Sequence, residues 1–211
     1  MRTGMRRWLW AMMAVALAGA PVKGSREPGG TMIGTRLGEL ERRTGLVTMK
    51  GNPITLLGPD LKVGEIAPDF RVVDSGFKAV QFDSLRGKPI LIAAVPSLDT
   101  KVCALETKRF NDELAKLPSD VQLLTISMDL PFAQMRFCDA EHIDRVRVLS
   151  DHVWREFGTR YGVLIENLGL LARSIFVVGR DGRIAYREIV PDLGQQPNYD
   201  AALDAIRRSA S

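Results

Sequence analysis

Cys103, one of two cysteines in the chain, lies where a strand should lead into a helix. Residues 89–95 form an apolar run that predicts a buried strand, and residues 102–117 place apolar side chains at helical spacing. Asp99 and Thr100 are both good N-cap residues, so the helix should begin at one of them. With Thr100 as the cap, Cys103 lies in the first turn, where free backbone N–H groups and the helix dipole favour a thiolate over a thiol. This geometry suits a reactive sulfur.

The second cysteine, Cys138, leaves a plainer interpretation open. Two cysteines in an exported protein most often form a stabilising disulfide that takes no part in chemistry. The chain has no CxxC motif, and its two histidines form no ligand cluster with the cysteines. A structural zinc site is therefore not expected.

The elements that must position these residues alternate between strand and helix after two short hairpins. The predicted hairpins and strands cover residues 46–57, 70–82, 89–95, 121–128, 145–149 and 174–190. The predicted helices cover residues 102–117, 131–138 or beyond, 153–161 and 199–208. Parallel β-α-β units followed by an antiparallel hairpin and a last helix describe a thioredoxin-like α/β sandwich, here with an N-terminal β-hairpin.

The helix at residues 102–117 should pack on the sheet through its apolar stripe. This stripe consists of Val102, Leu105, Phe110, Leu114 and Leu117. Its spacing near 3.6 residues predicts that these five side chains form the buried face of the helix.

The composition divides the chain into three segments. Residues 1–20 combine three arginines, no acid, an apolar run and small-residue cleavage patterns near Ala20, which together predict a signal peptide. The run is too short to span a bilayer comfortably, because about 20 residues are needed. Residues 21–45 are rich in Gly, Arg and Glu, which predicts a flexible linker, and residues 46–211 form the folded domain. The expected location is periplasmic or exported, or cytoplasmic if the N-terminal extension is a start-site artefact.

The positive charge of the chain gives no indication of nucleic-acid binding. Loss of residues 1–20 would remove three arginines and no acid, which reduces the formal charge from +4 to +1. No basic stripe with interleaved aromatic residues occurs in the rest of the chain. Nucleic acid is therefore not an expected partner.

The residues at 96–103 read PSLDTKVC, with Pro96, Thr100 and Cys103 at fixed spacing. This pattern of Pro, three residues, Thr, two residues and Cys resembles that of the peroxiredoxins. The wider chain, about residues 46–208, resembles their thiol peroxidase subfamily, the atypical two-cysteine peroxiredoxins. Its other motifs occur in the same order and are GNP at 51–53, DLPFAQ at 129–134, RFC at 136–138, GLLAR at 169–173 and PNYDAAL at 197–203.

This resemblance implies a role for each residue. Cys103 would be the peroxidatic cysteine, which peroxide oxidises to a sulfenic acid, and Cys138 the resolving cysteine, which closes an intramolecular disulfide with it. Thr100 would bridge thiolate and substrate, Pro96 would shield the sulfur, and Arg173 would supply fixed positive charge. Without the resemblance, Thr100 would be only an N-cap, Pro96 a strand end and Arg173 a solvated surface charge.

The function that the resemblance implies is thiol-dependent reduction of hydrogen peroxide and organic hydroperoxides, with a thioredoxin-like dithiol protein as reductant. It suggests a homodimer and implies no cofactor and no metal. Two other classes stay open. A thioredoxin-fold disulfide exchange protein would be expected to carry a CxxC motif. A non-enzymatic copper-binding or sensor protein would need paired cysteines close in sequence and a histidine ligand.

The position of Cys138 constrains the disulfide. If both helices follow parallel strands, both begin at the same edge of the sheet, and Cys138 lies roughly 10 Å along its helix. A disulfide requires Cα atoms within about 7 Å. We therefore expect the bond to require unwinding of one or both helix ends.

The segment at residues 1–20 gives the first testable prediction. If it directs export and is cleaved, N-terminal sequencing of the native protein should find a chain that begins near Pro21. A mature chain that retains Met1, or one that begins near Leu46, would contradict the prediction.

Overall fold

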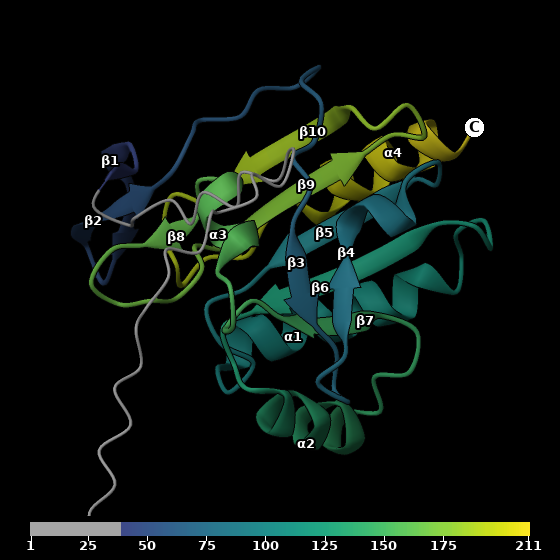
Figure 1. Ribbon diagram of the computed structural model, residues 1–211. Helices are drawn as coiled ribbons and strands as arrows, with labels where there is room; N and C mark the ends of the chain where they lie inside the picture. Colours follow the sequence, from purple (N-terminus) through teal and green to yellow (C-terminus); the bar gives the residue numbers. More distant parts are fainter. Residues whose placement is uncertain (1–38) are drawn as a thin grey trace, which may run out of the picture. The chain divides into compact units, whose positions relative to one another are not determined.

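The computed structural model describes residues 39–211, and the predicted signal peptide and most of the predicted linker lie outside them. A seven-stranded sheet forms the centre of the fold, in the order β10-β9-β5-β6-β7-β3-β4 (Figure 1). Its strands are β3 (Arg71–Val73), β4 (Ala79–Gln81), β5 (Ile90–Ala94), β6 (Gln122–Ser127), β7 (Arg147–Ser150), β9 (Ser174–Val178) and β10 (Ile184–Ile189). β5, β6 and β7 are parallel, and β9 and β10 are antiparallel.

A smaller sheet contains the N-terminal hairpin. It has the order β1-β2-β8, with β1 (Arg42–Met49), β2 (Asn52–Leu57) and β8 (Leu164–Ile165). The sequence analysis predicts the hairpin but not the two-residue strand β8. The parallel strands, the antiparallel pair and the hairpin together confirm the predicted thioredoxin-like sandwich.

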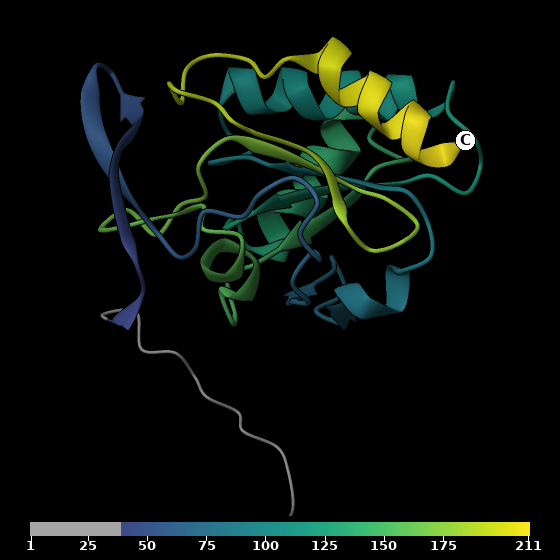
Figure 2. The same ribbon diagram turned by 90° about the horizontal axis from the view of Figure 1, so that it is seen from above.

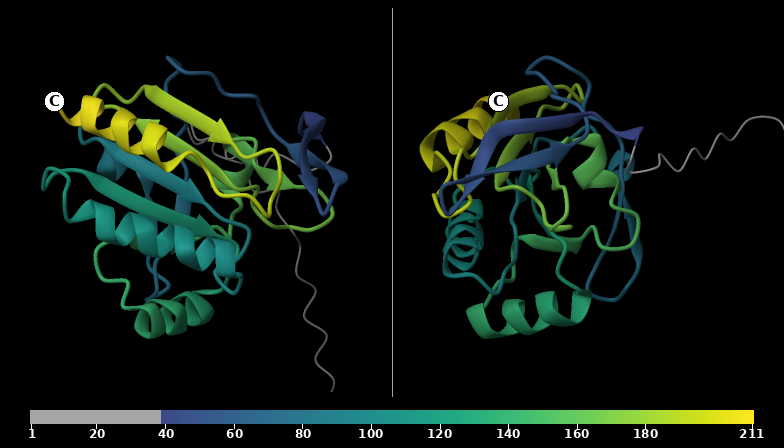
Figure 3. Two further views of the ribbon diagram at one scale, coloured as in Figure 1. Left: turned by 180° about the vertical axis from the view of Figure 1, so that it is seen from behind. Right: turned by 90° about the vertical axis from the view of Figure 1, so that its left-hand side faces the viewer.

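Helices cover both faces of the large sheet. They are η2 (Phe82–Leu85), α1 (Lys101–Leu114), α2 (Pro131–Glu141), α3 (Glu156–Arg160) and α4 (Tyr199–Ala210). Figure 2 and Figure 3 show α1 and α4 side by side on one face, with α3 and the η2 turn on the other. α2 lies beside β7, the strand that follows it (Figure 1).

Alternation along β5 divides the interior into two clusters. Ile90, Ile92 and Ala94 join the aromatic core beneath α3, which contains Phe70, Phe82, Phe157, Tyr161 and Phe176. Leu91 and Ala93 join the opposite core beneath α1 and α4, which contains Phe110, Leu123, Ile175, Val177, Leu203 and Ile206. Because all five residues of β5 are buried, this strand holds the loop that follows it at the centre of the fold.

The buried face of α1 differs from the predicted apolar stripe. Leu105 is exposed, and the buried residues of α1 are Cys103, Glu106, Thr107, Phe110 and Asn111. Asn111 is buried because its Oδ1 accepts hydrogen bonds from the backbone N–H groups that lead into β7, at residues 144–146. Hydrogen bonds to other elements therefore decide which face of α1 is buried. The apolar periodicity of the helix does not reveal such bonds.

The folded region begins earlier than predicted, because β1 includes residues 42–45 of the predicted linker. Arg43 is only 9% exposed. Its guanidinium donates to the carbonyl oxygens of Gly58 (3.0 Å) and Gly162 and to the carboxylate of Asp60 (3.0 Å). These contacts tie the first residues of β1 to the segment after β2 and to the loop before β8.

No helix within residues 39–211 has both the length and the apolar character required to cross a bilayer.

Arg43 gives a prediction about stability. Arg43→Met should lower the free energy of unfolding by about 3 kcal/mol, because two buried carbonyls and Asp60 lose a charged donor. The matched control is Arg42→Met, whose exposed ion pair with Glu166 should contribute less than about 1 kcal/mol. Urea denaturation of both variants measures the difference, and equal losses would contradict the buried contacts.

Candidate active site

Thr100 and Cys103 lie at the start of α1, directly after the central strand. α1 begins at Lys101 with Thr100 as N-cap, so Cys103 occupies the first turn, as predicted. The loop that joins β5 to α1 contains Pro96, which is buried. The side chain of Cys103 is completely buried, against Val95 and Leu98 of the same loop.

The Thr100 hydroxyl is directed at the sulfur. As an N-cap it would be expected to accept from a backbone N–H of the first turn, but its side chain makes no such bond. Thr100 Oγ1 lies 2.9 Å from Cys103 Sγ and 3.1 Å from the carbonyl oxygen of Ser97. Its one proton can serve either acceptor, so the hydroxyl can donate to the sulfur.

Arg173 approaches the sulfur from the neighbouring strand. It directly precedes β9, whose first residue Ser174 pairs with Ala94 at the end of β5. Arg173 Nη2 donates to Cys103 Sγ (3.3 Å) and to the carbonyl oxygen of Leu193 (3.0 Å). The side chain is 1% exposed, so the structure places this arginine in the interior and not on the surface. Strand pairing thus fixes a guanidinium beside the thiol.

Glu106 is the counter-ion of Arg173 and was not predicted from the sequence. It accepts a hydrogen bond from Arg173 Nη1 through Oε2, and its side chain is completely buried. Burial raises the pKa of Glu106 to about 7, against the opposing effect of the guanidinium. Burial lowers the pKa of Arg173, but Glu106 and Cys103 outweigh it and raise that pKa, so the guanidinium stays charged.

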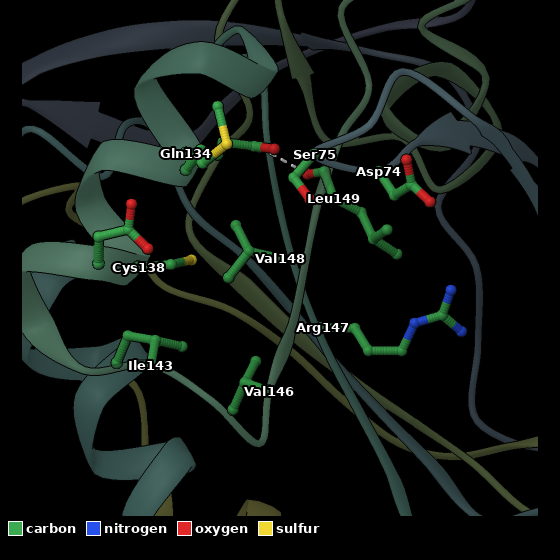
Figure 4. A pocket seen from close by; sticks show the side chains of 11 residues that line it. Asp74, Ser75, Gln134, Cys138, Ile143, Val146, Arg147, Val148 and Leu149 are labelled. Carbon is green, nitrogen blue, oxygen red and sulfur yellow. Dashed lines mark hydrogen bonds between the residues drawn. The ribbon is translucent and has the colours of Figure 1, made fainter.

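Cys138 lies in a different environment. It is the eighth residue of α2, and it lines a cavity of about 320 Å³ between α2 and β7. Figure 4 shows its sulfur pointing from α2 toward Val148 of β7. Burial, and to a lesser extent the charge of Asp139, raises the pKa of this thiol. The surroundings of Cys138 in the folded state therefore disfavour its thiolate.

Three of the five predicted site residues lie together in the structure. Of the other two, Pro96 lies nearby and Cys138 lies apart, in α2. Thr100 and Arg173 both contact Cys103, whereas Pro96 lies in the loop between β5 and α1. Both cysteines are free thiols. Phe137, which precedes Cys138, packs with Val148 against the cluster of Val95, Leu98 and Cys103, so apolar side chains of α2 and β7 adjoin the group that contains the buried thiol.

Two features of the sequence could have indicated Glu106, which the sequence analysis missed. Glu106 follows Cys103 by three residues and so lies on the same side of the helix. An acid on the face of a helix that points into the protein requires a buried partner. Arg173, already singled out, is that partner. The carbonyl of Leu193 gave no signal, because any residue supplies a carbonyl.

The arrangement can stabilise negative charge on Cys103 and on an oxygen atom beside it. A hydroxyl and a guanidinium both donate to Sγ in a site closed to water, where such donors act most strongly. Among residues 39–211, no group of three or more His, Cys, Asp or Glu side chains is placed to hold a metal ion.

The fold is that of a thioredoxin-like protein, with a buried thiol beside a guanidinium, and comparisons with known proteins agree with this class. A family model described as Redoxin matches residues 62–203. Thiol peroxidase of Bacillus subtilis (strain 168) is 46% identical over 161 residues, which are 76% of this chain and 96% of that protein. Thiol peroxidase of Oceanobacillus iheyensis is 48% identical over 162 residues, or 77% and 98% of the two chains.

A solved structure shows the same likeness. The peroxiredoxin-like protein from Aquifex aeolicus has a TM-score of 0.74 and 42% sequence identity, and the match covers 79% of this chain and 97% of that one. The chain therefore belongs to the redoxin family and, within it, to the thiol peroxidases. It is a thiol-dependent peroxidase, an oxidoreductase of the peroxiredoxin type.

Substitution of Arg173 should have effects that substitution of a surface arginine does not have. Arg173→Lys keeps the charge but loses the planar fork that reaches Cys103, Glu106 and the Leu193 carbonyl together. The first reaction with peroxide should slow about 100-fold. The free energy of unfolding should fall by about 2 kcal/mol, because buried acceptors lose a donor.

The control for this variant is Arg136→Lys, at an exposed position on α2. Stopped-flow peroxide consumption and urea denaturation should find Arg136→Lys close to the unchanged chain in both measurements. Unaltered peroxide kinetics in Arg173→Lys would remove this arginine from the site.

Proposed function

We propose that Cys103 is the peroxidatic cysteine and reduces hydrogen peroxide and organic hydroperoxides. Its thiolate attacks the terminal peroxide oxygen, an S–O bond forms and the O–O bond breaks. The sulfur becomes a sulfenic acid, and the leaving oxygen takes a proton to become water or an alcohol. One observation carries the proposal: Thr100 Oγ1 and Arg173 Nη2 both donate to the same completely buried sulfur.

The neighbouring residues would serve the same step. Arg173 holds positive charge beside the thiolate and the developing oxygen anion. Thr100 is exposed although its hydroxyl touches the buried sulfur, so peroxide would reach the sulfur on the Thr100 side and exchange hydrogen bonds with that hydroxyl. Pro96 is buried in the same loop and offers no N–H that could compete for the thiolate.

Cys138 would resolve the sulfenic acid. Its thiol attacks the Cys103 sulfur, a disulfide forms and water leaves, with the oxygen from the sulfenic acid and a proton from the thiol. In the folded state, burial raises the pKa of Cys138 and so disfavours its thiolate, and attack therefore requires release of α2. The light anchoring of α2, in which only Pro131 and Gln134 are fully buried, supports this release.

A thioredoxin-like dithiol protein would then regenerate the enzyme. Its two thiols reduce the Cys103–Cys138 disulfide and become a disulfide themselves. They thereby return the two electrons that the peroxide took from the enzyme. We further propose that the chain acts after export, directed by residues 1–20, and as a homodimer. The three arginines and the apolar run of the N-terminal segment support export.

The two cysteines should respond differently to substitution. Cys103→Ser should abolish peroxide consumption. Cys138→Ser should still consume about one equivalent rapidly, since sulfenic acid formation needs only the first sulfur. Its turnover with a dithiol reductant should collapse, and excess peroxide should convert the stalled sulfur to sulfinic acid, detected by intact mass.

A purely structural disulfide predicts a different pattern. Both serine variants would then lose stability alike and react with peroxide alike. Equal kinetics for the first equivalent of peroxide in Cys103→Ser and Cys138→Ser would therefore defeat the proposal.

A further inference from the structure

Asp129 connects the two segments that carry the thiols. It lies between β6 and α2, two residues before Pro131 begins α2. Its carboxylate accepts hydrogen bonds from Ser97 Oγ and from the backbone N–H of Leu98, both at 2.8 Å. Ser97 and Leu98 belong to the loop before α1. One half-buried carboxylate at the start of the Cys138 helix thus holds the loop that leads to Cys103.

Ser97 continues this connection to the sulfur. Its carbonyl oxygen accepts from the backbone N–H of Thr100 (3.2 Å) and lies 3.1 Å from Thr100 Oγ1. Its hydroxyl oxygen accepts from the N–H of Asp99 (3.3 Å) while donating to Asp129. A continuous series of contacts therefore runs from Asp129 through Ser97 and Thr100 to Cys103 Sγ.

The sheet holds Asp129 from the opposite side. Its backbone oxygen accepts from Ser150 Oγ (2.6 Å), at the end of β7, and its N–H donates to Ser127 Oγ (3.3 Å), at the end of β6. Ser127 Oγ also accepts from Gln134 Nε2 (3.0 Å), a buried anchor of α2, which donates in addition to the carbonyl of Leu149 (2.8 Å). The hinge of α2 and the loop before α1 therefore belong to one hydrogen-bonded network.

We propose that Asp129 is a positioning residue that couples the opening of α1 to the opening of α2, an inference that rests on the proposed function. While its carboxylate holds Ser97 and Leu98, Thr100 stays beside the sulfur and the site favours reaction with peroxide. When α2 unwinds from Pro131, Gln134 leaves Ser127 and Leu149, the network around Asp129 is loosened, and its carboxylate releases the loop before α1. Both thiol-bearing segments then open together, and the disulfide can form.

Asp129→Asn tests the coupling. The NH₂ of the carboxamide must face either the Leu98 N–H, which then loses its acceptor, or Ser97 Oγ, whose hydrogen bond is then reversed, and both contacts lose the negative charge that strengthens them. The peroxide step should slow about tenfold, measured as consumption of the first equivalent with Cys138→Ser as the parent. Disulfide formation in the two-cysteine chain should accelerate several-fold, measured by rapid quench and intact mass. Ser97→Ala should shift both rates in the same directions.

Opposite changes in the two steps distinguish positioning from a general loss of stability. The control is Asp60→Asn, another half-buried aspartate, whose partners Arg43, Lys62 and Arg187 lie at the N-terminal hairpin and β10. It should leave the ratio of the two rates unchanged. Slowing of both steps in Asp129→Asn, no change in either, or the same opposed change in Asp60→Asn would overturn the coupling.

Two further outcomes decide the remaining cases. If Asp129→Asn does not fold, Ser97→Ala decides alone, because it removes only the hydroxyl that donates to Asp129. A Cys138→Ser parent that consumes no peroxide would overturn the proposed function and the coupling with it. Normal parent kinetics with unchanged kinetics in the Ser97 and Asp129 variants would overturn the coupling alone.

Discussion

The contact between Arg173 and Cys103 depends on a buried ion pair. Glu106 and Arg173 are both excluded from water, and replacing such pairs by apolar residues often makes a protein more stable. Their presence here therefore calls for a reason other than stability. Glu106 directs one side of the guanidinium and the Leu193 carbonyl another, which leaves Nη2 aimed at the sulfur. The pair thus provides a positive charge that is already oriented before peroxide arrives.

Strand pairing makes this orientation possible. Arg173 and Cys103 are 70 residues apart in sequence, yet the antiparallel pairing of β9 with β5 places them side by side. Every residue of both strands is buried, so the position of the guanidinium is fixed by the most protected part of the fold. α2, by contrast, lies beside β7 and buries only Pro131 and Gln134 fully. The rigid part of the molecule holds the first thiol, and the lightly held part carries the second.

The sequence predicted the layers of the fold because hydrophobic periodicity reports burial along each element. It placed the helix start at Asp99 or Thr100, and the structure has Thr100 as the N-cap with Cys103 in the first turn. Apolar periodicity alone did not predict that Glu106 and Asn111, and not Leu105, face inward, because these polar side chains are buried against partners in distant elements. The same holds for Arg43, whose buried contacts extend β1 into the predicted linker, and for Asp129, whose partners are 31 and 32 residues away.

Under the proposed function, the different environments of the two thiols would also explain why peroxide oxidises Cys103 and not Cys138. A thiolate reacts with peroxide and a thiol does not do so effectively, and burial raises the pKa of Cys138 while α2 stays folded. Under the proposed function, Cys138 would thereby be protected from direct oxidation while α2 stays folded. Unwinding of α2 would expose Cys138 to water, remove the burial that disfavours its thiolate and free the segment that carries it. Activation of the second thiol would then coincide with its access to the first, so that the resolving step follows the oxidation step and does not compete with it.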